Sequence, residues 1–319
     1  MLARLAENLF WAGRYAERAE DTARLVDVTY HTLLESTEAD ESIAWRQVLE
    51  VLHLTGPFET SGAPLERAEV IRFLLVDGTN PGSVVSSVQR ARENLRSVRE
   101  LVSSELWEAA NQLHLELRAR DVSADLQQPY ELCGVVKRGG QTITGVAAET
   151  MPRDDGWRFL SLGRMLERAE MTCRLLDVRF DAIVDQPSAL GFHAWIAILK
   201  SVSAAEAFRR TYRSSMDPEH VLEFLLLAPQ FPRSVLFCLQ AAESYLQQVE
   251  AADRQGRARR QLGQVRSTVE FAHAGELLAA GLHGFLEDLL DGIARVSDAV
   301  ADEFFRHTPA GGLHIVAAN

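Results

Sequence analysis

The chain repeats part of its own sequence. Residues 13–28, GRYAERAEDTARLVDV, and residues 163–178, GRMLERAEMTCRLLDV, are identical at 11 of 16 positions. Residues 73–98 and 224–249 form a second pair, identical at 10 of 26 positions. Similar segments at a fixed offset are the mark of an internal duplication. Because the two pairs occur in the same order, 150 or 151 residues apart, the sequence predicts two copies of one unit.

The copies divide the 319 residues near residue 150. We expect a first unit at 1–150, a second unit at 151–304, and a C-terminal tail at 305–319 that has no counterpart in the first copy. Each unit then has the size of a common single domain, about 150 residues. The two units are expected to share one core, because the charged faces described below are best satisfied by each other.

The pattern inside each unit is helical. Residues 83–117 contain neither proline nor glycine and are predicted to form one long helix with Ser83 as its N-cap. Residues 189–213 are also predicted to form one helix, and the glycine-containing segment 137–145 to form a turn that leads into a helix. No segment shows the alternation of a half-buried strand. The predicted fold is all-α, a helical bundle made of two tandem-duplicated helical units with pseudo-twofold symmetry.

Composition excludes several classes of protein. Lys and Arg total 33 against 45 Asp and Glu, a net charge of −12, which argues against nonspecific binding to nucleic acid or to anionic membranes. No apolar run approaches the roughly 20 residues that span a bilayer. The three cysteines are widely spaced and form no CxxC pair, so they indicate a reducing compartment and no zinc site. We expect a cytoplasmic protein.

The repeated motif keeps six charged residues in both copies, three arginines and three acids. They are Arg14, Glu17, Arg18, Glu20, Arg24 and Asp27 in the first copy and Arg164, Glu167, Arg168, Glu170, Arg174 and Asp177 in the second. Residues 17, 20, 24 and 27 recur at spacings of three or four, so on a helix they share one face. The motif therefore predicts two helices that each carry a charged face.

Two interpretations of these charged faces remain open. Charges on a solvated helix are expected to drift apart after a duplication, whereas these are identical in both copies, which indicates constraint by burial or by a ligand. In the first interpretation the two helices pack together and their charges, which balance, form a buried ion-pair network. In the second, part of the charged face lines a cleft in which arginines bind a carboxylate or a phosphate.

Each copy also has a Pro-x-Ser corner at the start of a helix, Pro81-Gly82-Ser83 and Pro232-Arg233-Ser234. Free backbone N–H groups at a helix start bind anions, so Ser83, Arg233 and Ser234 form a candidate anion site. N-capping by the serines explains the same pattern without a ligand. The corners are not equivalent, because the first has a glycine where the second has Arg233.

A metal site is a weaker interpretation of the acidic residues. The Glu-x-x-His pattern of di-iron bundles occurs at Glu50 and His53. The alternative set of metal ligands, suited to Mg or Mn, consists of Glu17, Glu20, His31, Glu167, Glu170 and Asp181. Arginines interleave with these acids and would repel a cation, so we predict no metal and no other cofactor.

The motif GRxxERAExTxRLxDV, present twice, together with NPGSVVSSVQRAREN and FPRSVLFCL, resembles the Alpha-E family of helical proteins with an ER motif. The resemblance extends over essentially the whole chain. It implies a cytoplasmic bacterial protein, whose gene commonly lies beside, or is fused to, genes for a circularly permuted ATP-grasp protein and a transglutaminase-like protein. The family motif corresponds here to Arg14, Glu17, Arg18 and Glu20 and to their counterparts in the second copy, and it transfers no catalytic residue.

This resemblance implies a non-catalytic accessory protein that partners an ATP-grasp amide or peptide ligase and positions the substrate or the ligase. The expected partners are the ATP-grasp protein, the transglutaminase-like protein and a peptide substrate. One alternative is an enzyme whose active site is the duplicated face of arginines and glutamates. Another is a carboxylate-rich bundle that binds a metal.

Overall fold

The structure is a computed structural model that describes residues 2–34, 38–184, 188–213, 216–249 and 256–306. Helices are the regular elements throughout these residues, which confirms the all-α prediction. None of the described helices combines the length and the apolarity that crossing a bilayer requires.

The described residues up to Thr150 contain eight helices. They are α1 (Ala3–Thr32), α2 (Glu38–Val51), α3 (Thr55–Thr60), α4 (Arg67–Leu75), α5 (Val84–Ser97), α6 (Ser104–Ala119), α7 (Val122–Gln127) and α8 (Pro129–Thr150). Beyond Thr150, the part of the chain that the structure describes forms eight more helices and two π-helical turns. They are α9 (Asp155–Val184), α10 (Ser188–Ser201), α11 (Ala205–Tyr212), α12 (Pro218–Leu222), η1 (Glu223–Leu227), α13 (Val235–Val249), α14 (Arg257–Glu270), α15 (Ala274–Ala280), α16 (Leu282–Val300) and η2 (Ala301–Phe305).

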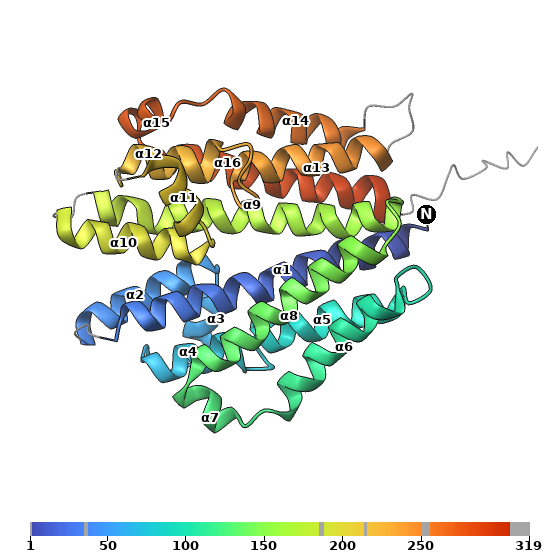
Figure 1. Ribbon diagram of the computed structural model, residues 1–319, viewed down its shortest axis with the longest axis horizontal. Helices are drawn as coiled ribbons and strands as arrows, with labels where there is room; N and C mark the ends of the chain where they lie inside the picture. Colours follow the sequence, from blue (N-terminus) through green and yellow to red (C-terminus); the bar gives the residue numbers. More distant parts are fainter. Residues whose placement is uncertain (1, 35–37, 185–187, 214–215, 250–255, 307–319) are drawn as a thin grey trace, which may run out of the picture.

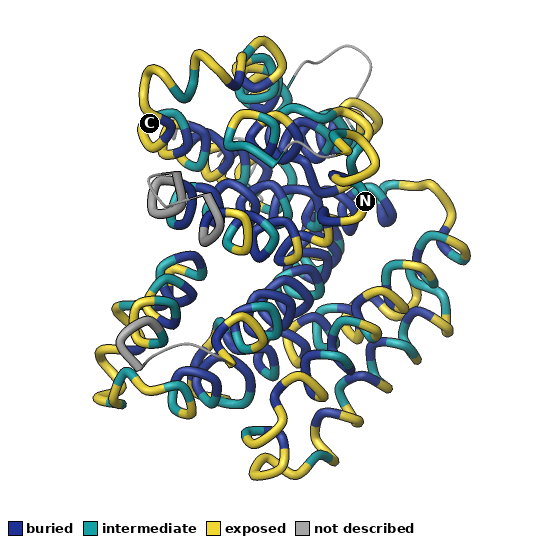
Figure 2. Tube along the Cα trace, turned by 60° about the vertical axis from the view of Figure 1, so that its left-hand side comes forward, coloured by how far each residue is buried: buried dark blue, intermediate teal, exposed yellow. Residues whose placement is uncertain are grey.

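The helices α1 and α9 lie side by side at the centre of the molecule (Figure 1). The helices α5 and α8 pack on α1, and α6 lies between them. In the same way α13 and α16 pack on α9, with α14 between them. The helices α2 and α10 each also contact the central helix of the other group, since α2 packs on α9 and α10 packs on α1. Buried residues follow the central helices in Figure 2, so the two groups of four helices meet along one buried seam.

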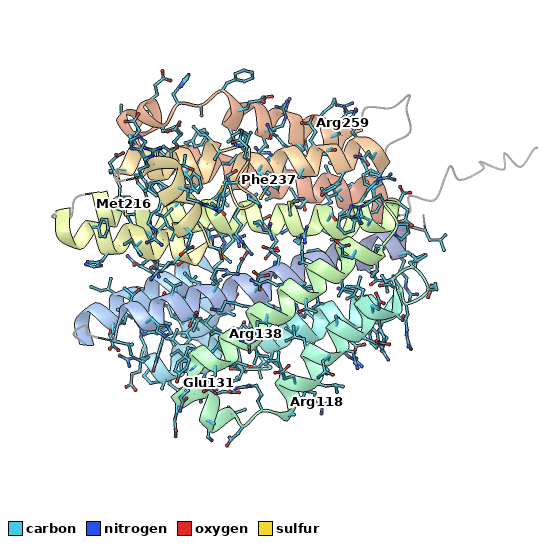
Figure 3. All side chains as sticks on the ribbon, in the orientation of Figure 1. Arg118, Glu131, Arg138, Met216, Phe237 and Arg259 are labelled. Atoms are coloured by element: carbon cyan, nitrogen blue, oxygen red, sulfur yellow. The ribbon has the colours of Figure 1, made fainter. Side chains whose placement is uncertain are left out.

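One apolar cluster extends from Ala6 to Val300 and draws residues from both groups of helices. Its largest fully buried side chains include Trp45, Phe10 and Phe180. Figure 3 shows side chains filling the space that separates the ribbons of α1 and α9. The ER motif of each central helix therefore lies within the packed interior.

Glycine determines how closely the central helices approach. A Cβ atom at Gly13 would lie 2.0 Å from the carbonyl oxygen of Leu160, and one at Gly163 would lie 2.0 Å from the carbonyl oxygen of Phe10. No Cβ atom fits at such a distance from a backbone oxygen. The first residue of the GRxxER motif is therefore the point where the two backbones touch, and it brings the following charges face to face.

Two predicted long helices are each divided in the structure. The segment 83–117 forms α5 and α6, and the second begins after Ser103, whose hydroxyl accepts a hydrogen bond from the N–H of Leu106 at 3.1 Å. The segment 189–213 is interrupted at Ser203, which has a φ of 54°. The prediction of uninterrupted helices was wrong because folding back buries both apolar faces, and neither break is marked by proline or glycine.

The segment 137–145, predicted as a turn, lies inside α8 instead. Its glycines serve packing rather than a turn. A Cβ atom at Gly139 would lie 2.5 Å from a methyl group of Leu113, and one at Gly140 would lie 3.0 Å from Glu20 Oε2. The turn prediction failed because the two glycines let α8 approach α6 and α1, a tertiary requirement that the local sequence does not reveal.

Candidate functional site

The charged faces of α1 and α9 meet in two matching ion pairs. Arg18 donates from Nε to Glu167 Oε1 at 2.5 Å and from Nη2 to Oε2 at 3.0 Å. Arg168 donates from Nε to Glu17 Oε1 at 2.6 Å and from Nη2 to Oε2 at 2.9 Å. Both glutamates are only 1% exposed. Such two-pronged guanidinium–carboxylate pairs fix orientation as well as charge, so each ER motif holds the other.

Arg14 also contacts Glu167 and links it to neighbouring polar side chains. Its Nη1 donates to Glu167 Oε2 at 2.9 Å, and its Nη2 donates to Glu170 Oε1 at 3.0 Å and to Ser297 Oγ at 2.6 Å. Burial alone would raise the pKa of Glu167, but Arg18 and Arg14 outweigh it and lower that pKa below its usual value. Glu167 is therefore held ionised between two arginines.

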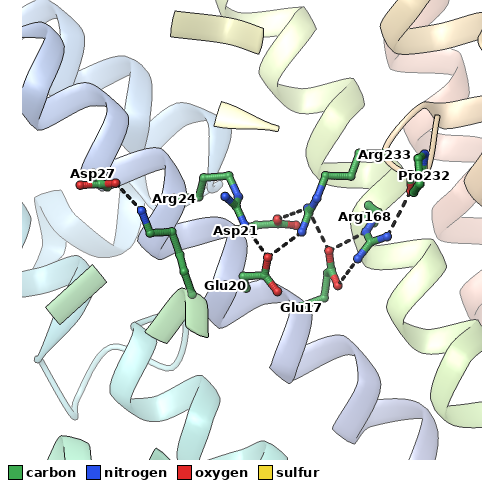
Figure 4. Close-up of polar contacts among 9 residues, drawn as sticks. Glu17, Glu20, Asp21, Arg24, Asp27, Arg168, Pro232 and Arg233 are labelled. Atoms are coloured by element: carbon green, nitrogen blue, oxygen red, sulfur yellow. Dashed lines mark hydrogen bonds and ion pairs between the residues drawn. The ribbon is translucent and has the colours of Figure 1, made fainter. Parts of the chain in front are cut away.

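Arg233 lies next to Glu17, as Arg14 lies next to Glu167 (Figure 4). Its guanidinium lies 2.6 Å from Asp21, 2.8 Å from Glu20 and 3.0 Å from Glu17. Burial opposes ionisation of Glu17, yet Arg168 and Arg233 lower its pKa to about 2. Arg24 pairs with Glu20 on the same helix. The sequence placed Arg233 in a candidate anion site beside the alternative of simple helix capping, and in the structure its guanidinium contacts the carboxylates of α1.

The ends of the charged faces reach other helices. Asp27 accepts from Lys137 of α8 at 2.5 Å, and Asp177 lies 2.6 Å from His283 of α16. Arg174 donates to Glu170 at 3.1 Å. Within the part of the chain that the structure describes, Arg164 is the one member of the duplicated set that forms no ion pair, and burial followed by Arg168 lowers its pKa.

The serines of the Pro-x-Ser corners act as helix caps. Ser83 accepts from the N–H of Ser86 at 3.2 Å, and Ser234 accepts from the N–H of Phe237 at 3.1 Å. Both serines are fully buried. Together with the contacts of Arg233, this geometry uses the candidate anion-site residues for capping and for internal ion pairing.

The candidate metal ligands are bound by cations of the chain itself. Arginines contact the carboxylates of Glu17, Glu20, Glu167 and Glu170, while His31 contacts Asp27. The side chain of Asp181 lies outside the described residues. Across the described residues there is no group of three or more His, Cys, Asp or Glu side chains arranged to hold a metal ion.

Part of the charged face remains open to a pocket of about 340 Å³ between α1, α5 and α9. Its polar lining consists of Arg18, Thr22, His53, Arg90, Glu167 and Arg174. Gly82, from the first Pro-x-Ser corner, also lines it. The pocket therefore combines several arginines with a glutamate that is already paired, and we call it the Arg90 pocket.

Sequence reasoning missed several of these pocket residues. Thr22 had a signal, because it is matched by Thr172 in the second copy, but its polarity drew no attention beside the charges. Arg90 had none, because the matching residue is Ala241. A larger pocket of about 450 Å³, lined by aromatic residues that include Tyr212, was also not foreseen. It lies at η1 and α11, away from the ER motifs.

The charge of Asp21 makes stability depend on pH. Burial, with Glu17 and Glu20 nearby, raises the pKa of Asp21 from 3.8 to about 7, against the opposing effect of Arg233. An acid that is neutral in the folded state and ionised in the unfolded state lowers stability as pH rises between those pKa values. Asp21→Asn should therefore gain stability relative to the wild type between about pH 4 and 7, by an amount on the order of a few kcal/mol.

Urea unfolding of both proteins at pH 5, 6, 7 and 8 measures this difference. A difference in unfolding free energy that stays constant over that range would show that Asp21 keeps an ordinary pKa in the folded protein.

The sequence pattern of a family described as "a predicted alpha-helical domain with a conserved ER motif" matches residues 1–305. The chain is also similar to uncharacterized proteins of Mycobacterium bovis and Mycobacterium tuberculosis. Each is 29% identical over 324 residues, covering 94% of this chain and 36% of the relative. The chain thus spans little more than a third of the length of these relatives. No solved structure matches it.

Proposed function

The chain belongs to the Alpha-E family, and from this premise we propose that it is a non-catalytic helical partner of an ATP-grasp amide or peptide ligase. In this role it positions the substrate or the ligase, and its partners are a circularly permuted ATP-grasp protein, a transglutaminase-like protein and a peptide substrate. A cytoplasmic location is part of the same proposal.

The proposed non-catalytic role rests on the hydrogen bonds and the burial of the motif glutamates, Glu17 and Glu167. Both carboxylate oxygens of Glu17 and of Glu167 accept hydrogen bonds from arginines, and both side chains are buried. A catalytic base or nucleophile needs an oxygen that reaches its substrate. The contacts support a structural use of the ER motif, which holds α1 against α9 and leaves the adjoining Arg90 pocket for binding.

The relatives support action together with another unit. Because this chain spans 36% of their length, each relative carries the matching region within a longer protein. A helical domain joined to further sequence is the arrangement expected of a domain that serves a neighbouring one.

We propose further that residues 1–150 and 151–304 are units derived by tandem duplication and related by a pseudo-twofold axis between α1 and α9, with 305–319 as a tail. Reciprocal contacts at the offset of 150 residues support this proposal. They include the two ER ion pairs and the two glycine contacts, in which Gly13 meets Leu160 while Gly163 meets Phe10.

Copurification with the ATP-grasp protein tests the proposed partnership. We expect a stable complex by size-exclusion chromatography with light scattering, faster amide formation by the ligase in that complex, and no turnover by this chain alone. The absence of a complex, together with an unchanged ligase rate, would contradict the proposal.

The same experiment tests the alternative that the chain is an enzyme in its own right. The presence of Glu167 and His53 in one pocket favours this alternative. That alternative predicts hydrolysis of ATP or of an amide by the isolated chain. It further predicts that Glu167→Gln abolishes this turnover while the circular dichroism spectrum of the protein stays unchanged.

A further inference from the structure

We propose that the Arg90 pocket is a binding site for a small organic anion, whose carboxylate or phosphate group is held by Arg18, Arg90, Arg174 and the hydroxyl of Thr22. This inference deepens the proposed function, since it names the class of substrate that the protein presents. It rests on unpaired polar groups in the pocket, on its charge, and on a comparison with the same place in the second half of the chain.

The first observation is a buried hydroxyl without a partner. Thr22 is 1% exposed and lines the pocket, yet its Oγ1 makes no hydrogen bond with the described residues. The Nε of Arg174, also in the pocket lining, is likewise buried without a partner. Buried polar groups in folded proteins are normally hydrogen-bonded. An anion in the pocket supplies the missing acceptor for both.

The second half shows the satisfied form of the same arrangement. Thr172, which matches Thr22, donates to the carbonyl oxygen of Arg233 at 3.1 Å. The residue that matches Arg233 in the first half is Gly82, and Thr22 makes no such bond to it. The threonine of the first half is therefore the one whose hydroxyl lacks a partner among the described residues.

The second observation is excess positive charge. Three arginines line the pocket against a single acid, Glu167. Arg18 is paired with Glu167 and Arg174 with Glu170, so the uncompensated charge is that of Arg90. Arg90 forms no ion pair with any described residue. Arg18 and Arg90 both lie over the ring of Tyr15, with each guanidinium carbon 5.5 Å from the ring centre. Guanidinium groups bind carboxylates and phosphates in two-pronged fashion, so Arg90 is suited to holding such an anion.

His53 is a further polar group of the pocket. Burial lowers its pKa below the usual value, and Arg174 adds to this shift. Both effects favour the neutral imidazole, which can donate a hydrogen bond to a bound anion.

The place that corresponds to the pocket by the offset of about 150 residues is occupied by Arg233. This arginine extends from the position that matches Gly82 and contacts Asp21, which matches Met171 of the pocket. The position of Arg90 is taken by Ala241. The guanidinium of Arg233 is thus neutralised by acids of α1, whereas the Arg90 pocket has Gly82 and Met171 at the matching positions and carries Arg90 in addition.

Size and lining limit the ligand further. A volume of about 340 Å³ fits a small organic molecule or the carboxylate end of a peptide substrate. Leu52, Leu54 and Met171 form the apolar part of the lining. A carboxylate or phosphate group attached to a short apolar segment matches both parts of the pocket.

Calorimetric titration of the full chain in low-chloride buffer tests the inference, with inorganic phosphate and succinate as the two probes. We expect at least one probe to bind the wild type, and the tighter one identifies the ligand as a phosphate ester or as a carboxylate. Arg90→Ala should weaken binding about tenfold or more, because it removes a charge-assisted contact. Arg99→Ala is the matched control, since Arg99 is also exposed and packs over an aromatic ring, Trp107, outside the pocket.

A second pair of variants separates binding from folding. Thr22→Val removes a hydroxyl that has no partner, so it should keep or raise the melting temperature while weakening the binding of the same probe about tenfold. Thr172→Val removes a hydroxyl that has a partner, so it should lower the melting temperature and leave binding unchanged. If the hydroxyl of Thr22 instead supports the fold, Thr22→Val should lower the melting temperature more than Thr172→Val does.

The inference is overturned if neither probe binds the wild type at millimolar concentration, or if Arg90→Ala and Thr22→Val bind as the wild type does. Because these titrations contain no ligase, their outcome is independent of complex formation. If the protein binds an anion but forms no complex with the ligase, the inference about the pocket stands and the proposed partnership is contradicted. If it forms the complex but binds no anion, the partnership stands and the inference about the pocket is contradicted.

Discussion

Gly13→Ala is expected to destabilise the protein by about 3 kcal/mol or more, as is Gly163→Ala. The new methyl group would lie 2.0 Å from a backbone carbonyl oxygen of the facing helix. A backbone atom cannot move aside as the end of a flexible side chain can, so α1 and α9 must separate. Separation stretches the ion pairs between Arg18 and Glu167 and between Arg168 and Glu17. Urea unfolding followed by circular dichroism measures the loss.

The matched control is Gly145→Ala in α8. Gly145 is exposed in the interior of a helix, and nothing lies within 4 Å of the position of its Cβ atom. This substitution should stabilise the protein by about 0.5–1 kcal/mol, because alanine is the better helix former. Equal stabilities of the Gly13 and Gly145 variants would mean that the central helices do not touch where the structure has them in contact.

Arg233→Met is expected to cost about 3–5 kcal/mol at pH 8, since it leaves buried carboxylates without their shared cation. Glu17 and Glu20 keep Arg168 and Arg24, but Asp21 has no other ion pair among the described residues. The pKa of Asp21 is already about 7 and should rise further without Arg233. The loss should therefore be smaller at pH 5, where Asp21 is neutral, and urea unfolding at the two pH values measures it.

The double variant Asp21→Met with Arg233→Met should recover much of the lost stability, because replacing a whole buried pair by apolar residues is nearly neutral. Methionine is also the residue that the second copy has at the position matching Asp21, namely Met171. Arg209→Met serves as the control, because Arg209 pairs with Glu206 on the surface, where such a pair contributes under about 1 kcal/mol. A loss at Arg233 as small as that at Arg209 would refute the buried network.

The sequence was most informative where its two copies agreed. Equal numbers of arginines and acids at matched positions left two interpretations open, helices that neutralise each other and a cleft that binds an anion, and the pairing of Arg18 with Glu167 has the form of the first. The helical fold followed from the spacing of apolar residues and the lack of alternation. These features are local or repeated, so a single sequence contains them.

The remaining features depend on contacts between distant segments. Lys137 and His283 reach Asp27 and Asp177 from α8 and α16, and no spacing in the sequence links them. Arg90 joins the pocket because α5 packs on α1. The break after Ser97 was hidden because Ser103 resembles an ordinary helical serine until α6 folds back. Such contacts are decided by packing, which local propensity does not determine.

The pairing of α1 with α9 has a consequence for synthesis on the ribosome. Of the two central helices, α1 leaves the ribosome first, carrying Glu17 and Arg14, and their partners Arg168 and Glu167 follow about 150 residues later. At translation rates of about 5–20 residues per second, that delay is about 8 to 30 s. Throughout this interval the nascent first half presents the charged face of α1 without the partners that α9 supplies, so the native pairing of the two helices waits for synthesis of the second half.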